Sequence, residues 1–245
     1  MSTVNPNPSA AMLVIGDEIL SGRTRDANMY YLAGELTKLG VDLKEVRVVS
    51  DDKDAIVSAV RALSTAYDHV FTSGGIGPTH DDITADCVAE AFEVSIDVRD
   101  DARALLAAHY AARGAEFNSA RMRMARIPDT AALIENPVSI APGFTVQNVH
   151  VMAGVPNIFQ AMVASVMPTL TGGAPLLSQT YRIDSPESTV AEPLGDLAAR
   201  YPDLSMGSYP FTQDGAFGTN IVIRGISGAQ VEAAMIELAN LFPRG

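Results

Sequence analysis

The chain has 245 residues, of which 47% are hydrophobic, and its formal net charge is −12. This length and apolar content suffice for one large domain, or for a medium domain with a small one attached, without disulfides or a structural metal. The single cysteine, Cys87, excludes a disulfide within the chain and fits a reducing compartment. The acidic balance disfavours nucleic acid as a partner, because binding to a phosphate backbone depends mainly on Lys and Arg.

The start of the chain carries no recognisable targeting signal. Residues 1–10 are polar, contain Pro6 and Pro8 and lack a basic residue, so we expect a short disordered lead-in and not a signal peptide. No run reaches the roughly 18 apolar residues that a membrane span requires. We therefore expect a cytoplasmic protein that does not associate with membranes.

Short β-branched runs alternate with amphipathic stretches over the first 170 residues, a pattern typical of parallel βαβ units. Strands are predicted at 12–15, 46–49, 69–73 and 149–152. Helices are predicted around apolar stripes at 30–39, 56–63, 88–92, 100–113 and 155–170. Over 114–148 the periodicity is weak, and no element is predicted there.

The segment from Thr171 to Pro175 contains two glycines and a proline and is typical of a linker. Beyond it the pattern predicts strands at 177–183, 204–210 and 219–224 and helices at 188–201 and 228–241. We therefore predict a doubly wound, mainly parallel α/β domain over residues 9–171. A small α+β domain with the order βαββα is predicted over residues 176–243.

A glycine-rich segment follows the predicted strand at 69–73. It reads Ser73-Gly74-Gly75-Ile76-Gly77-Pro78-Thr79-His80-Asp81-Asp82-Ile83-Thr84. Glycines let the backbone turn sharply and expose N–H groups, and a helix beginning near Asp82 or Thr84 would also attract anions. Open α/β sheets bind ligands at this end of their strands. The segment predicts a phosphate-binding loop. The alternative is a tight structural turn whose aspartates only cap a helix.

Two carboxylates, Asp81 and Asp82, adjoin this loop, and beside a bound phosphate they would be repelled unless a cation intervened. Mg²⁺ or a similar divalent cation, held by one carboxylate and the ligand's phosphates, would remove that repulsion. A second polar cluster, Gly16-Asp17-Glu18 followed by Asp26-Ala27-Asn28, comes after the first strand and should face the same crevice. Its alternative interpretation is a solvated loop in which Asp26 caps the next helix.

These motifs resemble a known family. The pattern from Ser73 to Thr84 is similar to the signature loop of the molybdopterin-binding superfamily, and more narrowly to the N-terminal part of the competence/damage-inducible protein A family. Further segments fit that family in order: Gly16–Leu20, Asp26 with Asn28, Ala141–Phe144 and Gly154–Pro156. The segments 187–197, 207–210 and 221–224 resemble its small second domain.

The resemblance implies two chemistries at one loop. Relatives of the competence type hydrolyse the pyrophosphate of ADP-ribose-like dinucleotides with a divalent metal, and a similar domain accompanies some FAD synthases. Other relatives bind molybdopterin, adenylylate it or insert molybdate. The chain ends without the amidohydrolase domain of full-length members, so deamidation of nicotinamide nucleotides is not implied.

Two segments depart from the family pattern. Ala27 stands where Thr is usual, and in the segment 153–159 Ala153, Ile158 and Phe159 stand where Pro, Glu and Met are usual. The loss of the acidic side chain at Ile158 puts in doubt any role that it plays in the relatives. This departure favours a third possibility, a nucleotide- or pterin-binding scaffold without turnover.

We predict a metal-dependent hydrolase of the pyrophosphate bond in ADP-ribose- or FAD-like dinucleotides, with molybdopterin binding or adenylyl transfer as the first alternative. Asp82 and Asp81 are assigned to catalysis, and Asp82 and Asp17 to the cation. The expected partners are a nucleotide or pterin ligand and further copies of the chain. The residues expected to bind the ligand are Gly16, Asp17, Asn28, Ser73, Gly74, Gly75, Gly77, Pro78, Thr79, Gly143 and Gly154.

Other chemically active residues carry weaker signals. The histidines lack zinc-ligand spacing, and His80 either contacts phosphate or faces solvent. Cys87 is assigned to core packing. The aromatic residues of 207–217 are a candidate peptide or RNA platform, which the acidic net charge disfavours for RNA. A solvated helix face is preferred over phosphate contact for Arg121, Arg123 and Arg126.

Overall fold

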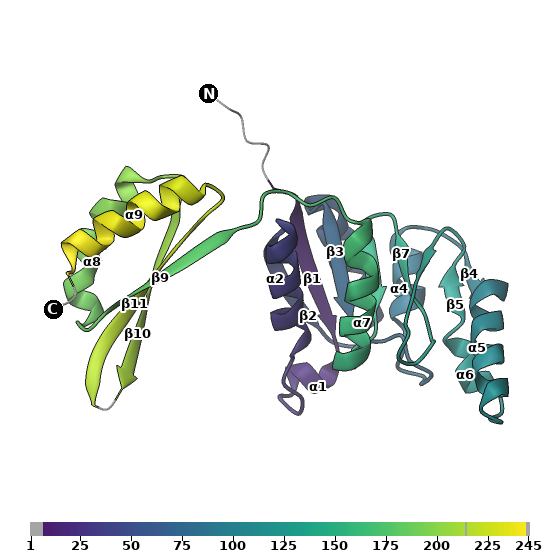
Figure 1. The fold of residues 1–245 in the computed structure, drawn as a ribbon. Helices are drawn as coiled ribbons and strands as arrows, with labels where there is room; N and C mark the ends of the chain where they lie inside the picture. Colours follow the sequence, from purple (N-terminus) through teal and green to yellow (C-terminus); the bar gives the residue numbers. More distant parts are fainter. Residues whose placement is uncertain (1–6, 214, 244–245) are drawn as a thin grey trace. The chain divides into compact units, whose positions relative to one another are not determined.

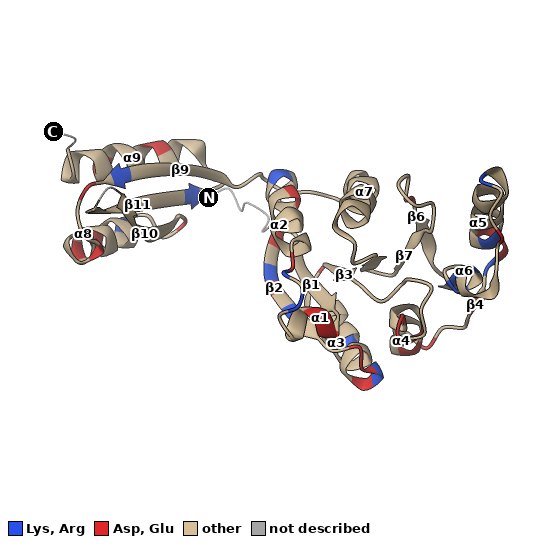
Figure 2. Ribbon diagram, turned by 90° about the horizontal axis from the view of Figure 1, so that it is seen from below, with Lys and Arg blue, Asp and Glu red and all other residues tan. Residues whose placement is uncertain are grey.

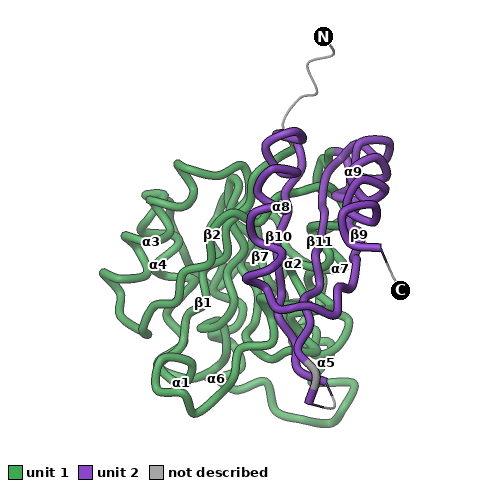
Figure 3. Tube along the Cα trace, turned by 90° about the vertical axis from the view of Figure 1, so that its left-hand side faces the viewer, with its two compact units in different colours: residues 1–173 green, residues 174–245 purple. Residues whose placement is uncertain are grey.

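The computed structural model describes residues 7–213 and 215–243, and the chain divides into two compact units, unit 1 (residues 1–173) and unit 2 (residues 174–245) (Figure 3). Of the predicted lead-in, residues 1–6 lie outside the described residues. The rest of it is ordered, because Pro8 accepts a backbone hydrogen bond from Asp42 and the first strand already begins at Ser9. No described helix is long and apolar enough to cross a membrane.

A six-stranded sheet in the order β2-β1-β3-β8-β7-β6 forms the centre of unit 1 (Figure 1). The first four strands pair in parallel, whereas β7 and β6 run antiparallel to their neighbours. A separate two-stranded sheet pairs β4 with β5. The strands are β1 (Ser9–Ile15), β2 (Asp42–Val49), β3 (His69–Ser73), β4 (Ile96–Val98), β5 (Arg126–Pro128), β6 (Ala132–Ile134), β7 (Gly143–Val146) and β8 (Val149–Met152).

Alternate residues of β1 point into two separate cores, which are packed on opposite faces of the sheet. Leu13 belongs to the core with α3 (Lys53–Ala66), α4 (Thr84–Ala91) and α5 (Asp100–Ala112). Met12 belongs to the core with α2 (Asn28–Leu39) and α7 (Pro156–Val166). Helices therefore cover both faces (Figure 2), which explains the uninterrupted apolar run of β1. The predicted doubly wound fold is confirmed.

The stretch 114–148, for which periodicity predicted no element, contains several short ones. They are α6 (Ser119–Arg123), β5, β6 and β7. The last two make the sheet mixed and not uniformly parallel. The helix predicted at 155–170 is also shorter than expected: α7 ends at Val166, and a 3-10 turn, η1 (Met167–Thr169), follows around Pro168.

Unit 2 contains a three-stranded antiparallel sheet in the order β10-β11-β9. Its elements are β9 (Leu177–Ile183), α8 (Glu187–Arg200), β10 (Ser205–Gln213), β11 (Ala216–Gly225) and α9 (Gly228–Leu241). Val190 and Leu197 of α8 and Val231 and Leu238 of α9 are buried in a core of their own with the inward residues of the sheet. The predicted smaller α+β unit is confirmed.

The sheet of unit 1 also determines where a ligand can bind. After β1 the chain continues to α2 on one face of the sheet, whereas after β3 it continues to α4 on the other face. Loops that leave neighbouring parallel strands in opposite directions open a crevice at the carboxyl ends of those strands. The crevice between β1 and β3 is therefore the expected ligand site.

Candidate functional site

A cavity of ≈ 550 Å³, partly open to solvent, lies at the carboxyl ends of β1, β3 and β8. It is large enough for a ligand site, since such sites usually occupy roughly 300–1,000 Å³. Four connecting segments contribute to its lining. They are the segments after β1 (Gly16 and Glu18), after β3 (Gly74 to Pro78, Asp81 and Asp82), before β7 (Asn136, Ser139 and Ala141) and after β8 (Ala153 to Pro156). We call it the ligand cavity. The parallel strands bring together loops that are far apart in the sequence.

The glycines after β3 are required by both conformation and space. Gly74 and Gly75 have φ angles of 113° and 69°, in the left-handed region that favours glycine. A Cβ atom on Gly74 would collide with the carbonyl oxygen of Ile15, and one on Gly75 with the hydroxyl of Thr84. The loop can therefore lie directly against the end of β1 and the start of α4 only with glycine at these positions.

The same loop presents a row of free backbone donors. Its base is fixed, because Gly74 donates to Met152 O at 3.1 Å and Thr84 donates to Gly75 O at 3.0 Å and, through its hydroxyl, to Gly74 O at 3.0 Å. By contrast, the N–H groups of Gly75, Ile76 and Gly77 donate to no acceptor in the described part of the chain. Successive free N–H groups in a turn form an anion-binding concavity.

The sequence predicts Asp82 or Thr84 near the start of a helix, but neither side chain caps α4. The helix begins at Thr84 without a side-chain cap, and the Thr84 hydroxyl is used by the glycine loop. Asp82 Oδ2 instead accepts hydrogen bonds from Thr79 N at 2.8 Å and Thr79 Oγ1 at 2.5 Å. The carboxylate closes a turn at the tip of the loop and still lines the ligand cavity. Pro78 also lines the cavity, whereas Thr79 does not and instead donates both hydrogen bonds that close this turn.

One wall of the ligand cavity is acidic. Its carboxylates come from three segments: Glu18 in α1 (Asp17–Leu20), Asp51 after β2, and Asp81 with Asp82 after β3. Burial, followed by repulsion from neighbouring carboxylates such as Glu18 and Asp81, raises the pKa of Asp51. Negative charge is therefore concentrated at this wall, and no Lys or Arg of the described chain offsets it at Asp51.

Among the acidic residues, the lining of the cavity differs from the sequence expectation at Asp17 and Asp51. Asp17, expected to bind ligand and metal, does not line the cavity, whereas its neighbour Glu18 does. Consecutive residues of a helix point roughly 100° apart, so α1 turns only one of the two inward. Asp51, for which the sequence predicts no role in the site, lines the cavity and accepts a hydrogen bond from Asp17 N at 2.9 Å.

Asn28 and Ser73, both predicted to bind ligand, are buried and hold the loops together. Asn28 Nδ2 donates to Ser73 Oγ at 2.7 Å and to Gly154 O at 2.8 Å, which joins α2 to β3 and to the loop after β8. Neither Asn28 nor Ser73 lines the ligand cavity, whereas Gly154 does. Asp26 accepts hydrogen bonds from the backbone of Asn28 and Met29 and so caps α2, as its alternative interpretation expected.

Gly143, also expected to bind the ligand, lies away from the lining of the ligand cavity. It starts β7 and is buried, and a Cβ atom there would lie 2.5 Å from the carbonyl oxygen of Val151 in the neighbouring strand. Sheet pairing and not ligand approach therefore requires glycine at this position. The loop before it contributes instead, because Asn136 bonds both Ser139 and Ala141 and all three line the cavity.

The wall that remains is apolar. Ile158, which stands where the family usually has Glu, lies in this wall. An aromatic ring system could be buried here beside the acidic wall and the free N–H groups. The apolar lining residues are Ile15, Ile76, Pro78, Met124, Ala141, Ala153, Val155, Pro156, Ile158 and Met162.

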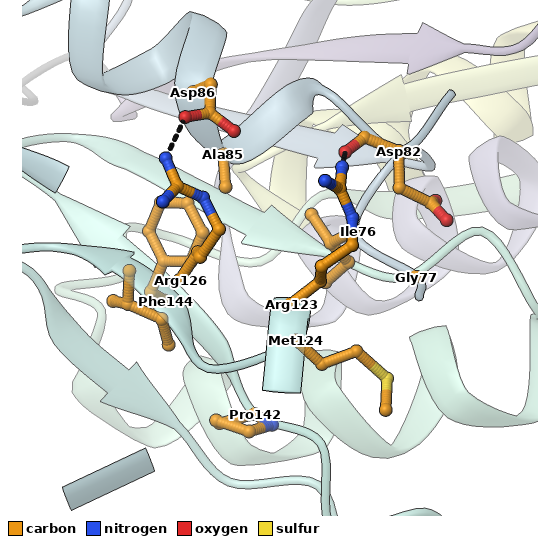
Figure 4. Close-up of a pocket in the computed structure, with 12 residues that line it drawn as sticks. Ile76, Gly77, Asp82, Ala85, Asp86, Arg123, Met124, Arg126, Pro142 and Phe144 are labelled. Atoms are coloured by element: carbon orange, nitrogen blue, oxygen red, sulfur yellow. Dashed lines mark hydrogen bonds and ion pairs between the residues drawn. The ribbon is translucent and has the colours of Figure 1, made fainter. Parts of the chain in front are cut away.

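The weaker candidates fall in different places. The side chain of His80 is 99% exposed, so it faces solvent. Cys87 is buried, and burial raises its pKa to about 11, which fits its assignment to the core. Arg121 lies over the ring of Tyr110. The prediction that Arg123 and Arg126 lie on a solvated helix face is wrong, because both line a second cavity next to the loop (Figure 4).

Comparison with known proteins agrees with this architecture. Residues 11–172 match the model of a family described as a probable molybdopterin binding domain. The chain belongs to this family. Residues 175–245 match a second model, described as the middle domain of FAD synthase. The resemblance to the molybdopterin-binding superfamily is thus confirmed. The matched residues 11–172 lie in unit 1, which contains the ligand cavity.

Individual relatives belong to two named groups. The crystal structure of the protein CinA from Thermoplasma acidophilum is 32% identical and superposes with a TM-score of 0.62, covering 67% of this chain and 99% of that one. A probable FAD synthase of Caenorhabditis elegans is 34% identical over 95% of this chain and 50% of its own length. A CinA-like protein of Desulfosudis oleivorans is 33% identical over 81% of this chain and 51% of its own length. The chain therefore spans about half the length of these two sequence relatives.

Proposed function

We propose that unit 1 binds a dinucleotide such as FAD or ADP-ribose by its diphosphate and hydrolyses the pyrophosphate bond. The observation that carries the proposal is the row of free N–H groups at Gly75, Ile76 and Gly77, on the edge of a cavity with one acidic and one apolar wall. The names of the relatives support a flavin nucleotide, since one is a probable FAD synthase and unit 2 matches the middle domain of FAD synthase.

In this proposal each part of the ligand has a matching wall. The diphosphate oxygens accept hydrogen bonds from the N–H groups of residues 75–77, in a turn that only glycine can form this close to β1. A ring of the ligand packs against the apolar wall, which includes Met124, Val155 and Ile158. Asn28 keeps the loops after β3 and β8 at a fixed separation.

The acidic wall fits a divalent cation. Carboxylate oxygens are the donors that Mg²⁺ prefers. The pKa of Asp51 is raised first by burial and then by repulsion from carboxylates such as Glu18 and Asp81, and a cation at this wall would relieve that repulsion. No three His, Cys, Asp or Glu side chains among the described residues converge into a ready-made site. One or two of Asp81, Asp82 and Glu18 would therefore hold the ion together with ligand phosphates and water. Bound there, the ion would neutralise charge on the phosphates and acidify a water molecule.

Hydrolysis requires a water molecule placed in line with the bond to be broken. Its oxygen bonds to one phosphorus, the bridging P–O bond breaks, and FAD yields AMP and riboflavin phosphate. Asp82 is suited to orient this water, because both of its hydrogen bonds to Thr79 use Oδ2 and Oδ1 has no partner in the described chain. The carboxylate takes up the proton that the water loses and returns it to solvent.

The test is chromatography of FAD and ADP-ribose incubated with the protein, with Mg²⁺ and with a chelator. We expect AMP from at least one dinucleotide with Mg²⁺ and none with the chelator. Equal turnover in both would remove the cation from the mechanism. Tight binding without any AMP would instead support a nucleotide-binding scaffold without turnover, the possibility that Ile158 in place of the usual Glu favours.

A second candidate is molybdopterin binding, which the family match over residues 11–172 favours. A pterin ring would use the same apolar wall, and its phosphate the same N–H groups. Mass spectrometry of the small molecules released when the purified protein is denatured separates the two candidates. A pterin phosphate would replace the dinucleotide proposal, whereas FAD, FMN or AMP would support it.

A further inference from the structure

A second, much smaller cavity of ≈ 20 Å³ adjoins the ligand cavity at the glycine loop, and Figure 4 shows the residues that line it. Gly75, Ile76, Gly77, Asp82 and Met124 line both cavities. An anion held by the free N–H groups at residues 75–77 would therefore lie at the boundary of the two. The side chains of the smaller cavity then belong to the surroundings of that anion.

Two arginines line this smaller cavity, and one of them is already neutralised. Arg126 pairs with Asp86 at 2.5 Å and lies 3.9 Å from Asp97. The hydrogen bond to Asp86 is the largest cause of the raised pKa of Arg126. Figure 4 shows this pair on the side of the cavity away from Asp82. Arg126 is therefore committed to carboxylates of its own.

Arg123, at the end of α6, has no such partner. It forms no ion pair in the described chain, and its one hydrogen bond runs from an Nη atom to the backbone carbonyl of Asp82 at 3.3 Å. Its Nε atom is buried and has no hydrogen-bond partner among the described residues. A guanidinium carries five N–H donors, so most of the donor capacity of Arg123 is unused next to the loop.

The charged side chains that line the ligand cavity beside Arg123 are all acidic. Glu18, Asp51, Asp81 and Asp82 line the ligand cavity, and no Lys or Arg among the described residues lines it. An anionic ligand entering such a cavity needs a positive group at the point where its charge is concentrated. Among the residues that line the two cavities, Arg123 is the cation without a carboxylate partner.

We propose that Arg123 binds the phosphate of the ligand and that the anion is held between its guanidinium and the N–H groups of residues 75–77. The preferred ligand is a diphosphate, because its adjacent oxygens can accept from the planar fork and from the backbone at the same time. The diphosphate character of the ligand rests on the proposed function. The bond to Asp82 O holds the guanidinium against the loop before the ligand arrives.

A purely structural role for Arg123 would have different consequences. If the side chain only fixed the Asp82 carbonyl, its loss would lower the melting temperature of the ligand-free protein, and a soluble cation would not restore binding. If it binds phosphate, its loss weakens anion binding, and free guanidinium ion entering the vacated space restores part of the affinity. Rescue therefore separates the two roles.

The experiment measures the affinity of the full chain for ADP-ribose, FAD and inorganic pyrophosphate by calorimetry, in the parent and in Arg123→Gln and Arg123→Lys. The matched control is Arg121→Gln, on the same short helix but with its guanidinium over Tyr110. We expect Arg123→Gln to weaken binding of each diphosphate that the parent binds by roughly tenfold to a hundredfold. Arg123→Lys should lose less, and Arg121→Gln should bind as the parent does.

Each outcome decides one of the two proposals. A parent that binds dinucleotides, with Arg123→Gln binding them equally well, overturns the role of Arg123 and leaves the proposed function intact. A parent that binds pyrophosphate in an Arg123-dependent way but no dinucleotide overturns the proposed function alone. A parent that binds neither overturns both. If Arg123→Gln fails to fold, Arg123→Lys decides, because parent-like affinity for pyrophosphate and parent-like salt dependence would contradict a bidentate contact.

Discussion

Asp82 is the single residue on which the proposed chemistry depends most. It accepts two hydrogen bonds from Thr79 and also lines the ligand cavity. We expect Asp82→Asn to lower the rate of AMP release by roughly two to four orders of magnitude, because the variant keeps the shape but loses the charge that positions water or metal. Affinity for ADP-ribose without added metal should be retained. The measurement is turnover per folded molecule, with affinity and melting temperature on the same preparation.

The neighbouring Asp81 provides the matched control. It is exposed at the tip of the same loop and lines the same cavity, but the turn to Thr79 is closed by Asp82. Asp81→Asn removes a similar charge and leaves both hydrogen bonds between Thr79 and Asp82 in place, so we expect a smaller loss of rate. It loses only the hydrogen bond with Thr79 that lowers the pKa of Asp81. An Asp82→Asn protein that works at the parent rate would contradict the catalytic assignment of Asp82. A larger loss with Asp81→Asn would transfer that assignment to Asp81.

His150 predicts a dependence of stability on pH. Burial, and to a lesser extent the neighbouring His69, lower the pKa of His150 from 6.5 to about 4. Because the folded-state pKa is depressed, the stabilisation is present above the unfolded-state pKa near 6.5 and is lost as the pH falls towards 4. The shift corresponds to at most about 3 kcal/mol of unfolding free energy.

Urea unfolding at pH 7 and at pH 5 tests this dependence on His150. The parent should lose stability between the two values, and His150→Gln should lose less, since it removes the titrating group. His80→Gln is the control, because the side chain of His80 is 99% exposed. Identical pH dependence in the parent and in His150→Gln would show that other groups dominate.

At the scale of elements, the loop between β3 and α4 owes its shape to collisions as well as to φ angles. Gly75 has a positive φ, and a Cβ atom there would strike the Thr84 hydroxyl; Gly114 also has a positive φ, but nothing lies within 4 Å of its Cβ position. We expect Gly75→Ala to lower ligand affinity at least tenfold, while Gly114→Ala costs about 1 kcal/mol of stability with unchanged affinity.

Calorimetry and melting temperatures of the two glycine variants measure these effects. Both variants strain the backbone at a positive φ, so any additional loss of affinity or stability in Gly75→Ala measures the displacement of the loop by the collision with Thr84. Equal affinity in Gly75→Ala, Gly114→Ala and the parent would show that the loop does not bind the ligand. The proposed position of the diphosphate would then be wrong.

The elements that sequence predicts well are those with a strong local signal. The long buried strand β1 and the amphipathic α3 follow from apolar runs and stripes of their own residues. By contrast, β6 and β7 have three and four residues and gain their stability from antiparallel pairing, β6 with β7 and β7 with β8. Such pairing leaves no periodicity over so few residues, so the region could not be predicted.

The site shows the same division between local and spatial information. The glycine loop is visible in the sequence because three glycines and a following helix act on adjacent residues. Gly143 carries an equally good motif but is buried in the sheet, and only its neighbours in space reveal this. The choice between Asp17 and Glu18 depends on the phase of a helix of four residues, which no sequence pattern defines.

At the scale of the whole molecule, the two units have separate cores. The buried residues of unit 2, such as Val190, Ile221 and Leu238, form a cluster that contains no residue of unit 1. All residues that line the ligand cavity belong to unit 1. A domain with its own core can fold alone. The binding site and the second unit should therefore be separable by cutting the chain at 173.

We expect residues 1–173, produced alone, to bind ADP-ribose or FAD within twofold of the full chain and to melt cooperatively. Residues 174–245 should also fold, at a lower melting temperature, because a small domain buries a smaller fraction of its surface. Calorimetry of the two pieces and of the full chain measures both effects, and the full chain should show two transitions. Loss of binding in a folded 1–173 piece would show that unit 2 supplies part of the site. A single transition in the full chain, at a temperature that neither piece reaches, would show that the two units stabilise each other.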